Sequence, residues 1–389
     1  MENNDLSERL NRMLKFLNSD PSNLSLFSEC FDLSMRLGDF EKAQDLVDDA
    51  LKLHPNEHSV YFEQSKIYLA LGNYEDAVSA LNSIREQGTN NSGIVYNLAW
   101  AKLNLAQYEA VIQEIDQASQ YINEYPALLL VKVRALHHLQ EMQAAIENVN
   151  IYLEIDPENA EANGLKAMLL LDSAMFPEAK IYAEKALKHN PYNHEALITF
   201  YSLALNEQDP DKAITYLTVQ KELTGKSGRL MLNLGQTHML NMQFEEAEKA
   251  LKEAGVLMAG HIGTWHALAW AEIILNKIDD AKRCFERAME LDRNFSESHG
   301  GLAVIAALQD DLALAEKLAK KAVRLDPQSV SGRYAESLIL DKQGKPEAAK
   351  SKVTDLISSA KAGDGQSITA LIQKANERLS IAPSDETLH

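Results

Sequence analysis

Apolar residues in this chain recur at spacings of three and four, which is typical of helices with one buried face. These runs come in pairs, and a short polar turn separates the two runs of a pair, for example at residues 37–39, 71–73 and 343–345. The phrase LGDFEKAQDLVDDALKLHP from Leu37 returns in altered form as SAMFPEAKIYAEKALKHNP from Ser173. The hydrophobic pattern therefore predicts a chain of helix–turn–helix pairs.

The pairs have a fixed length of 34 residues. When Leu24 is taken as position 1, ten units follow one another without an insertion and fill residues 24–363. Position 20 holds alanine in nine of the ten units, and a small side chain there lets the two helices of a unit pack closely. The units begin at residues 24, 58, 92, 126, 160, 194, 228, 262, 296 and 330.

Proline marks the end of several units. It stands at position 32 in four of them, and it cannot continue a helix because its nitrogen carries no hydrogen. The unit from His194 has Gly225 at this position instead. We therefore expect the stack of helices to be weakest in that unit, and to bend or open there first.

Both ends of the repeated region carry a further apolar stripe, as a stack of repeats requires to cover its outer faces. Residues 1–23 have apolar side chains at helical spacing and are predicted to form an N-terminal capping helix. Residues 364–381 carry a second stripe, between Ile368 and Leu379, and are predicted to form a C-terminal capping helix. Residues 382–389 are expected to be a flexible tail.

These features resemble the tetratricopeptide repeat family, whose 34-residue unit places Trp, Leu, Gly, Tyr, Ala, Phe and Pro at set spacings. The fullest match is WHALAWAEIILNKIDDAKRCFERA, which begins at Trp265, and the resemblance covers residues 24–363. It implies an all-α, right-handed α-solenoid of about ten 34-residue units with a capping helix at each end. It also implies binding of other proteins, without indicating which.

Some units depart from the family pattern at position 7, where an apolar residue is usual. Members of the family with a carboxylate clamp place lysine, asparagine and arginine at fixed positions of three consecutive units, and no three consecutive units here match that pattern. A receptor of that kind is therefore disfavoured. The polar residues at position 7 are Gln64, Lys132, Lys166 and Glu336.

The composition is that of a folded protein, with 46% hydrophobic and 24% charged residues. The 38 basic and 57 acidic side chains give a formal net charge of −19, which repels nucleic-acid phosphates. We therefore expect no nucleic-acid partner. The same charge favours neutral or basic protein partners.

The sequence predicts a cytoplasmic protein. Its first residues lack the apolar core of a secretory signal. The stretch 254–271 has no charged side chain, but the repeat register places a turn in its middle, so no membrane insertion is expected. Cys30 and Cys284 are far apart in sequence and predict neither a disulfide framework nor a zinc site. The family resemblance favours a bacterial source.

Candidates for catalysis are few. His137, His138 and Glu141 come nearest to a metal cluster, and histidines at a solvated helix end are the simpler interpretation. No hydrolase, metalloprotease or P-loop motif occurs in the chain. Cys284 is interpreted as an ordinary half-buried thiol. The sequence therefore predicts no enzyme, no cofactor and no metal.

The remaining candidate is the inner face of the solenoid, which in this family is lined by the first helix of each unit. Trp100 and Trp270 both fall at position 9 on that face. Apolar and aromatic side chains with amides beside them suit a peptide or helix of a partner, and Arg134 either clamps a carboxylate or is solvated. The predicted groove residues are Tyr96, Asn97, Trp100, Leu130, Arg134, Met168, Asn233, Gln236, His266 and Trp270.

An equally good interpretation is that several of these side chains pack between neighbouring first helices and never meet a ligand. We interpret the chain as a non-catalytic scaffold or adaptor that binds a peptide or helical segment of a partner in this groove. The resemblance suggests the assembly of a bacterial pilus, secretion or envelope machine. The alternative is a structural protein whose groove or end forms a homodimer.

Overall fold

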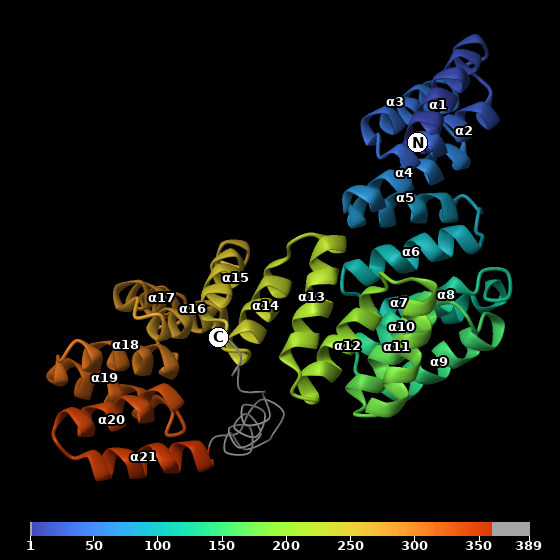
Figure 1. The fold of residues 1–389 in the computed structure, drawn as a ribbon. Coiled ribbons are helices and arrows are strands. Elements are labelled where there is room, and N and C mark those ends of the chain that lie inside the picture. The colour runs from blue at the N-terminus through green and yellow to red at the C-terminus, as the bar shows by residue number, and fades with distance from the viewer. Residues whose placement is uncertain (1, 360–389) are drawn as a thin grey trace, which may run out of the picture. The chain divides into compact units, whose positions relative to one another are not determined.

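The computed structural model describes residues 2–359, and within them the chain forms 21 α-helices, one short 3₁₀ helix and no strand. The chain divides into two compact units, Met1–Leu203 and Ala204–His389, which we call the N-terminal unit and the C-terminal unit. Figure 1 shows the successive paired helices of each unit. The prediction of an all-α helical repeat solenoid is confirmed.

The N-terminal unit begins with a single helix and continues as helix pairs. Its boundary falls inside its last helix, which belongs to the repeat predicted to be weakest. The helices are α1 (Glu2–Ser19), α2 (Leu24–Leu37), α3 (Phe40–Leu53), α4 (His58–Leu71), α5 (Tyr74–Glu86), α6 (Ser92–Asn104), α7 (Tyr108–Gln117), η1 (Ser119–Tyr121), α8 (Ala127–His138), α9 (Met142–Ile155), α10 (Ala160–Asp172), α11 (Phe176–His189) and α12 (His194–Asn206).

The C-terminal unit repeats the same pairing. The predicted C-terminal capping helix, residues 364–381, and the predicted tail, residues 382–389, lie outside the described residues. The helices are α13 (Pro210–Thr224), α14 (Gly228–Leu240), α15 (Phe244–Leu257), α16 (Ile262–Ile274), α17 (Ile278–Leu291), α18 (Ser296–Leu308), α19 (Leu312–Leu325), α20 (Val330–Lys342) and α21 (Pro346–Ser359).

The helices keep the 34-residue register of the sequence. Each first helix begins at position 1 of its repeat, except α8, which begins one residue later, and each second helix begins at position 17. The residue before several first helices is an asparagine whose side chain accepts a hydrogen bond from the backbone N–H three residues on. These capping residues are Asn23, Asn91, Asn159 and Asn193.

The turn inside each repeat has a left-handed backbone at position 15. All ten turns show it, with φ between 56° and 78°, although only three of the ten residues are glycine. For the others this conformation costs about 1 kcal/mol or more, so helix packing must impose it. The residues are Gly38, Gly72, Ala106, Gln140, Ala174, Gln208, Met242, Asn276, Asp310 and Gly344.

Small residues let the two helices of a repeat approach closely. Every position-20 residue from Ala43 to Ala349 is buried. At position 8, a β-carbon added to Gly235 would lie 2.4 Å from the side chain of Leu251 on α15. The predicted role of these columns in close helix packing is confirmed.

The first helix of the chain, α1, packs on α2. Leu10 of α1 is 6% exposed and belongs to the same core cluster as Phe27 and Phe31. On the outside, Arg9 donates to the Glu29 carboxylate at 2.5 Å. This helix lies within residues 1–23 and covers the apolar side of the first repeat.

Within the described residues, no helix combines the length and apolar character needed to cross a membrane. The uncharged stretch 254–271 is divided between α15 and α16 by a turn.

First helices of neighbouring repeats lie side by side in each unit. In the N-terminal unit α4 contacts α6, α6 contacts α8 and α8 contacts α10, and in the C-terminal unit α14 contacts α16 and α18 contacts α20. We call the surface that they form the first-helix face of each unit. The predicted groove residues all belong to these first helices.

Candidate partner-binding surface

A pocket of about 230 Å³ opens on the first-helix face of the N-terminal unit, across α6, α8 and α10. Three predicted groove residues, Trp100, Arg134 and Met168, line it from position 9 of three consecutive repeats. Equivalent positions of stacked repeats lie next to one another, so one sequence column supplies this wall. The full lining is Trp100, Leu103, Asn104, Arg134, His137, His138 and Met168.

Aromatic neighbours hold the Trp100 ring. It stacks on Tyr96 of the same helix, with ring centres 6.4 Å apart and 10° between the planes. Tyr125, just before α8, meets Tyr96 edge-on at 5.1 Å. Burial raises the pKa of the Tyr96 hydroxyl, so that group stays neutral. The Trp100 indole is thus a fixed, partly exposed wall of the pocket.

Arg134 is held by two carboxylates of the chain itself. Its Nη1 donates to Glu195 Oε1 at 2.8 Å and its Nη2 to Glu161 Oε1 at 3.0 Å. Burial alone would lower the pKa of Arg134, but these two glutamates outweigh burial and the net pKa is raised. One cation with two carboxylates is net negative, so Arg134 is neither simply solvated nor free to clamp a partner's carboxylate.

The two histidines at the end of α8 have partners within the chain. His137 Nε2 lies 2.6 Å from Asp172 Oδ2, and the His138 ring stacks on Tyr108 with ring centres 4.5 Å apart. In the part of the chain that the structure describes, no group of three or more His, Cys, Asp or Glu is placed to hold a metal ion. These histidines shape the rim of the pocket.

His266 of α16 is packed inside the C-terminal unit. Its Nε2 lies 2.9 Å from Ser298 Oγ of α18, and its ring meets Phe285 and Phe295 edge-on at 5.1 Å and 5.2 Å. Burial lowers the pKa of His266 to about 4, so the ring is neutral near pH 7. These contacts agree with the interpretation that several predicted groove residues pack between neighbouring helices instead of meeting a ligand.

Trp270 of α16 also contacts neighbouring helices. Its ring centre lies 5.9 Å from that of Phe285 on α17 and 6.1 Å from that of Tyr334 on α20. Val304, at position 9 of the next repeat, is only 1% exposed. Within the C-terminal unit, position 9 is thus exposed at Gln236, half-buried at Trp270 and buried at Val304.

The other four predicted groove residues differ in exposure. Leu130 is 4% exposed and belongs to the core, so its side chain is not open to a ligand. Asn97 of α6 and Asn233 of α14 are half-buried, and Gln236 of α14 is exposed. The ten predicted residues thus fall into two sets, six on the N-terminal unit and four on the C-terminal unit.

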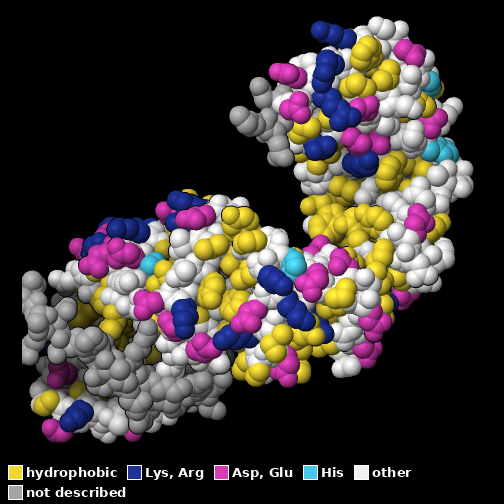
Figure 2. All heavy atoms as spheres, turned by 45° about the vertical axis from the view of Figure 1, so that its right-hand side comes forward, with side chains coloured by type: hydrophobic (Ala, Val, Ile, Leu, Met, Phe, Trp, Pro, Cys, Tyr) yellow, Lys and Arg dark blue, Asp and Glu magenta, His cyan; other side chains and the backbone are white. Residues whose placement is uncertain are grey.

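Apolar side chains are exposed at position 13 of three consecutive repeats in the C-terminal unit. They are Leu240, Ile274 and Leu308, with exposures of 66%, 49% and 38%. Three consecutive repeats of the N-terminal unit hold polar residues at the same position, and Figure 2 shows charged side chains interspersed with apolar ones over much of the surface in view. These polar residues are Asn104, His138 and Asp172.

Cys284 is buried, so the prediction of a half-buried thiol was wrong. It is 7% exposed, and its Sγ lies 3.3 Å from Oε2 of Glu272, which is 1% exposed. Cys284 faces the first helix of its own repeat, where Glu272 stands. Burial, together with that carboxyl group, raises the pKa of the thiol, which opposes the thiolate that a nucleophile requires.

Sequence reasoning missed the groups that hold Arg134. Glu161 and Glu195 both stand at position 2 of their repeats, one and two repeats after the arginine. A charge at the same position of consecutive repeats was a usable signal, because the first helices of successive repeats are neighbours. Tyr125 gave no such signal, because it lies outside the first helices.

Comparison with known proteins adds a family and distant relatives. The sequence profile described as Tetratricopeptide repeat matches residues 31–92 and 266–330. The BBSome complex member bbs-4 of Caenorhabditis elegans is 23% identical over 192 residues, which are 49% of this chain and 42% of that protein. The BBSome complex member BBS4 of Bos taurus is 22% identical over 216 residues, which are 56% of this chain and 42% of that protein. The chain therefore spans less than half the length of these curated relatives.

Among solved structures, YrrB is described as a TPR protein with an unusual peptide-binding site. It is 18% identical to this chain and has a TM-score of 0.45. The match covers 49% of this chain and 98% of YrrB.

Proposed function

Because this chain belongs to the tetratricopeptide repeat family, we propose that it is a non-catalytic scaffold that holds a segment of a partner protein on the first-helix face of its N-terminal unit. The observation that carries the proposal is the column Trp100, Arg134 and Met168, which lines one pocket from three successive first helices. A rigid indole beside an open pocket is the kind of anchor that dominates binding energy in protein interfaces.

The surroundings of the pocket indicate the kind of segment that fits. An apolar side chain of the partner would insert beside Trp100, and the half-buried amide of Asn97 would bond its main chain. The group formed by Arg134, Glu161 and Glu195 is net negative, and so is the whole chain at −19. The segment should therefore be extended or helical, apolar at its centre and neutral or basic at its flanks.

The proposed biological role is that of a component of a protein assembly. The two curated relatives are by name members of a complex, and they come from animals. A role in a bacterial pilus, secretion or envelope machine, a bacterial source and a cytoplasmic location stay predictions. So does the division of residues 24–363 into ten repeats between two caps. The proposed principal site is the N-terminal set of groove residues without the buried Leu130, and the four C-terminal groove residues form a separate set.

Peptide selection tests the proposal even though the partner is unidentified. Peptides are selected from a displayed library on the full-length chain, and their affinities are measured by fluorescence polarisation. Trp100→Ala should weaken the selected peptides about tenfold or more, because the anchor wall is lost. Ile181→Ala is the matched control, because Ile181 is an apolar side chain, 51% exposed, on the second helix α11.

Circular dichroism establishes that both variants are folded. Equal affinity of the wild type and Trp100→Ala for every selected peptide would contradict the proposal. The proposal would also be contradicted if the selected peptides bound Ile181→Ala more weakly than the wild type but bound Trp100→Ala as tightly as the wild type.

Self-association is a second candidate function, and exposed apolar side chains in the C-terminal unit favour it. Leu240, Ile274 and Leu308 stand at the same position of three consecutive repeats. A row of this kind is what a second copy of the chain could cover. Sedimentation velocity over a range of concentrations would then show a dimer that Leu240→Glu together with Ile274→Glu converts to a monomer. A monomer at every wild-type concentration would remove this function.

A further inference from the structure

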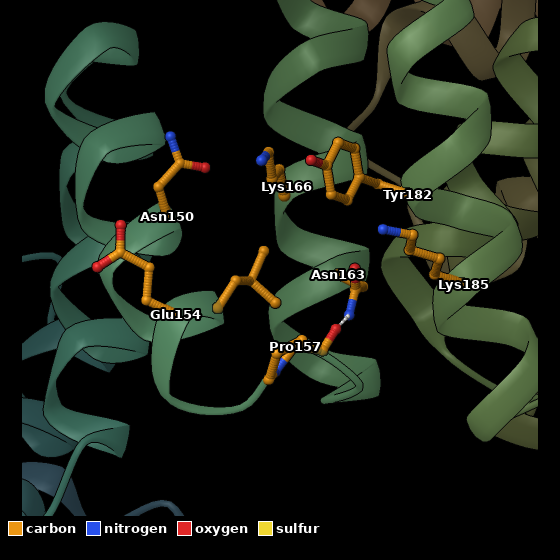
Figure 3. Close-up of a pocket in the computed structure, with 8 residues that line it drawn as sticks. Asn150, Glu154, Pro157, Asn163, Lys166, Tyr182 and Lys185 are labelled. Atoms are coloured by element: carbon orange, nitrogen blue, oxygen red, sulfur yellow. Dashed lines mark hydrogen bonds between the residues drawn. The ribbon is translucent and has the colours of Figure 1, made fainter.

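A second pocket, of about 430 Å³, lies elsewhere in the N-terminal unit, between the second helices α9 and α11. Figure 3 shows residues of α9 on one side of it, residues of α11 on the other and residues of α10 between them. Because it is lined mainly from second helices, this pocket is separate from the one at Trp100. Its lining consists of Asn150, Leu153, Glu154, Pro157, Asn163, Lys166, Tyr182 and Lys185.

Two lysines meet at one tyrosine in this pocket. Lys166 Nζ lies 3.9 Å from the centre of the Tyr182 ring, and Lys185 Nζ lies 5.0 Å from it. Neither lysine forms an ion pair with a residue between 2 and 359. In a chain with a formal charge of −19, two neighbouring cations that pair with no carboxylate call for a physical explanation.

The preceding repeat shows what such a lysine does when an acid is present. Lys132 stands at position 7, as Lys166 does, and its Nζ lies 2.5 Å from Asp116 Oδ1, at position 25 of the repeat before. The residue equivalent to Asp116 for Lys166 is Asn150. Figure 3 shows the Asn150 amide facing Lys166 across the pocket. An uncharged amide thus occupies the place of the carboxylate, and a pocket opens at that place.

The base of the pocket also holds an unused acceptor. Asn163 is 0% exposed, and its Nδ2 donates to the carbonyls of Pro157 at 2.9 Å and Asn159 at 2.8 Å. Its Oδ1 is buried and accepts no hydrogen bond from a described group. Because buried acceptors are normally satisfied, a ligand N–H would supply what this oxygen lacks.

The Glu154 side chain limits the charge that the pocket accepts. Figure 3 shows its carboxylate directed away from the opposite wall. Even so, it belongs to the lining and repels a dianion more than a monoanion. A single carboxylate with an N–H nearby suits this arrangement better than a phosphate.

We propose that this pocket binds a single carboxylate group that carries an amide N–H close by, as in an N-acylated neutral amino acid or an acidic residue of a peptide. The ligand carboxylate takes the place that Asp116 has beside Lys132, and it pairs with Lys166 and Lys185. Its N–H approaches Asn163 Oδ1. The volume of the pocket, about 430 Å³, lies in the range of small-ligand sites. This site goes beyond the proposed scaffold function and does not depend on it.

Isothermal titration calorimetry of the full-length chain with N-acetylglycine, a monoanion whose N–H lies next to its carboxylate, at constant ionic strength, tests the site. Lys166→Met keeps most of the apolar stem and removes the charge, and it should weaken binding about tenfold or more. Lys132→Met is the matched control at the same repeat position and should bind the probe like the wild type. Lys185→Met serves in place of Lys166→Met if that variant does not fold.

Asn150→Asp is the sharpest variant, because it places a carboxylate opposite Lys166, as Asp116 stands opposite Lys132. It should abolish binding of N-acetylglycine and raise the melting temperature of the chain. Trp100→Ala should leave binding of this probe unchanged, so that failure of this site and failure of the scaffold proposal can be told apart.

Two further probes separate the sources of the carboxylate. Tighter binding of an N-acetylated, C-amidated tetrapeptide with one glutamate identifies a peptide side chain, and tighter binding of N-acetylglycine identifies a free acid. Inorganic phosphate that binds as well as both would overturn the carboxylate assignment. The proposal also fails if neither carboxylate probe binds at about 10 mM, or if Lys166→Met and Asn150→Asp bind as the wild type does.

Discussion

The first-helix faces of the two units differ at the same repeat position. At position 9 of the N-terminal unit, Trp100, Arg134 and Met168 surround a pocket of about 230 Å³. At position 9 of the C-terminal unit, Trp270 contacts rings of two other helices, and Val304 is 1% exposed. One column of the repeat therefore lines a pocket from Trp100 to Met168, whereas from Trp270 to Val304 it passes from half-buried to buried.

The side chains at positions 5 and 6 contribute to the burial around Val304. The repeat that begins with α18 has Gly300 and Gly301 there, whereas the repeat of α8 has Leu130 and Val131. A β-carbon at Gly300 would lie 2.4 Å from the backbone nitrogen of Gly332 on α20. Gly300 lets α20 approach α18 closely, and Gly301 makes room for the ring of Phe285 on α17. The burial of a side chain at a given repeat position thus depends on the residues beside it.

The largest expected effect comes from Gly300→Ala, which would break the close packing of α18 and α20. The new methyl group would meet backbone atoms that cannot move aside as a flexible side chain does, so we expect a loss of about 3 kcal/mol in local stability. Hydrogen exchange of peptides covering residues 296–342 measures it.

Gly260→Ala is the control for this substitution, because a β-carbon at Gly260 would have no neighbour within 4 Å. If both variants exchange like the wild type, the glycines do not set the distance between the helices, and the explanation of the difference between the units is wrong.

The next effect concerns His266, whose neutral ring is part of the packed C-terminal face. Burial lowers its pKa to about 4, compared with 6.5 for an exposed histidine. Between these pH values the unfolded chain binds a proton that the folded chain does not. The contribution of His266 to the free energy of unfolding is therefore fully present above pH 6.5. It is lost as the pH is lowered towards 4, and the loss is at most about 3 kcal/mol.

Urea unfolding at pH 7 and at pH 4.5 tests the prediction for His266. His266→Gln keeps a polar group near Ser298 and removes the titration, so the variant should lose less stability on acidification than the wild type. Identical losses in the two proteins would mean that His266 is accessible to water and not held neutral by burial.

The smallest effect concerns the turns, where the two units should behave alike. Ala174 in the N-terminal unit and Met242 in the C-terminal unit have φ of 57° and 58° at position 15. Replacement of either residue by glycine should stabilise the chain by about 1 kcal/mol, because glycine adopts this backbone without a steric penalty. Thermal unfolding measures both. A gain in one unit alone would show that the units differ in their turns as well.

Much of the fold could be predicted from the sequence, because the repeat is a local pattern with a constant period. The register that begins at Leu24 locates the start of nine first helices at the predicted residue and the tenth within one residue. The alanines of position 20 lie where the helices of a repeat meet. Each of these features depends on residues that lie within a few turns of one another.

The candidate site was predicted only in part. Trp100, Arg134 and Met168 were placed on one face by the register, and the structure brings them to one pocket. The partners of Arg134 come from two other repeats, 27 and 61 residues further along the chain. A hydrogen bond over such a separation depends on side-chain directions that the period does not specify.

The sequence by itself determined the helices, their order and the face on which each residue of a first helix lies, because these follow from a period of 34 residues and from helix geometry. Only the tertiary structure decided that Trp100 lines a pocket while Trp270 contacts rings of α17 and α20, and that Lys132 has an acid while Lys166 faces a pocket. The physical reason is that helix separation and charge pairing depend on the volumes and charges of side chains from neighbouring repeats, which meet only in the folded chain.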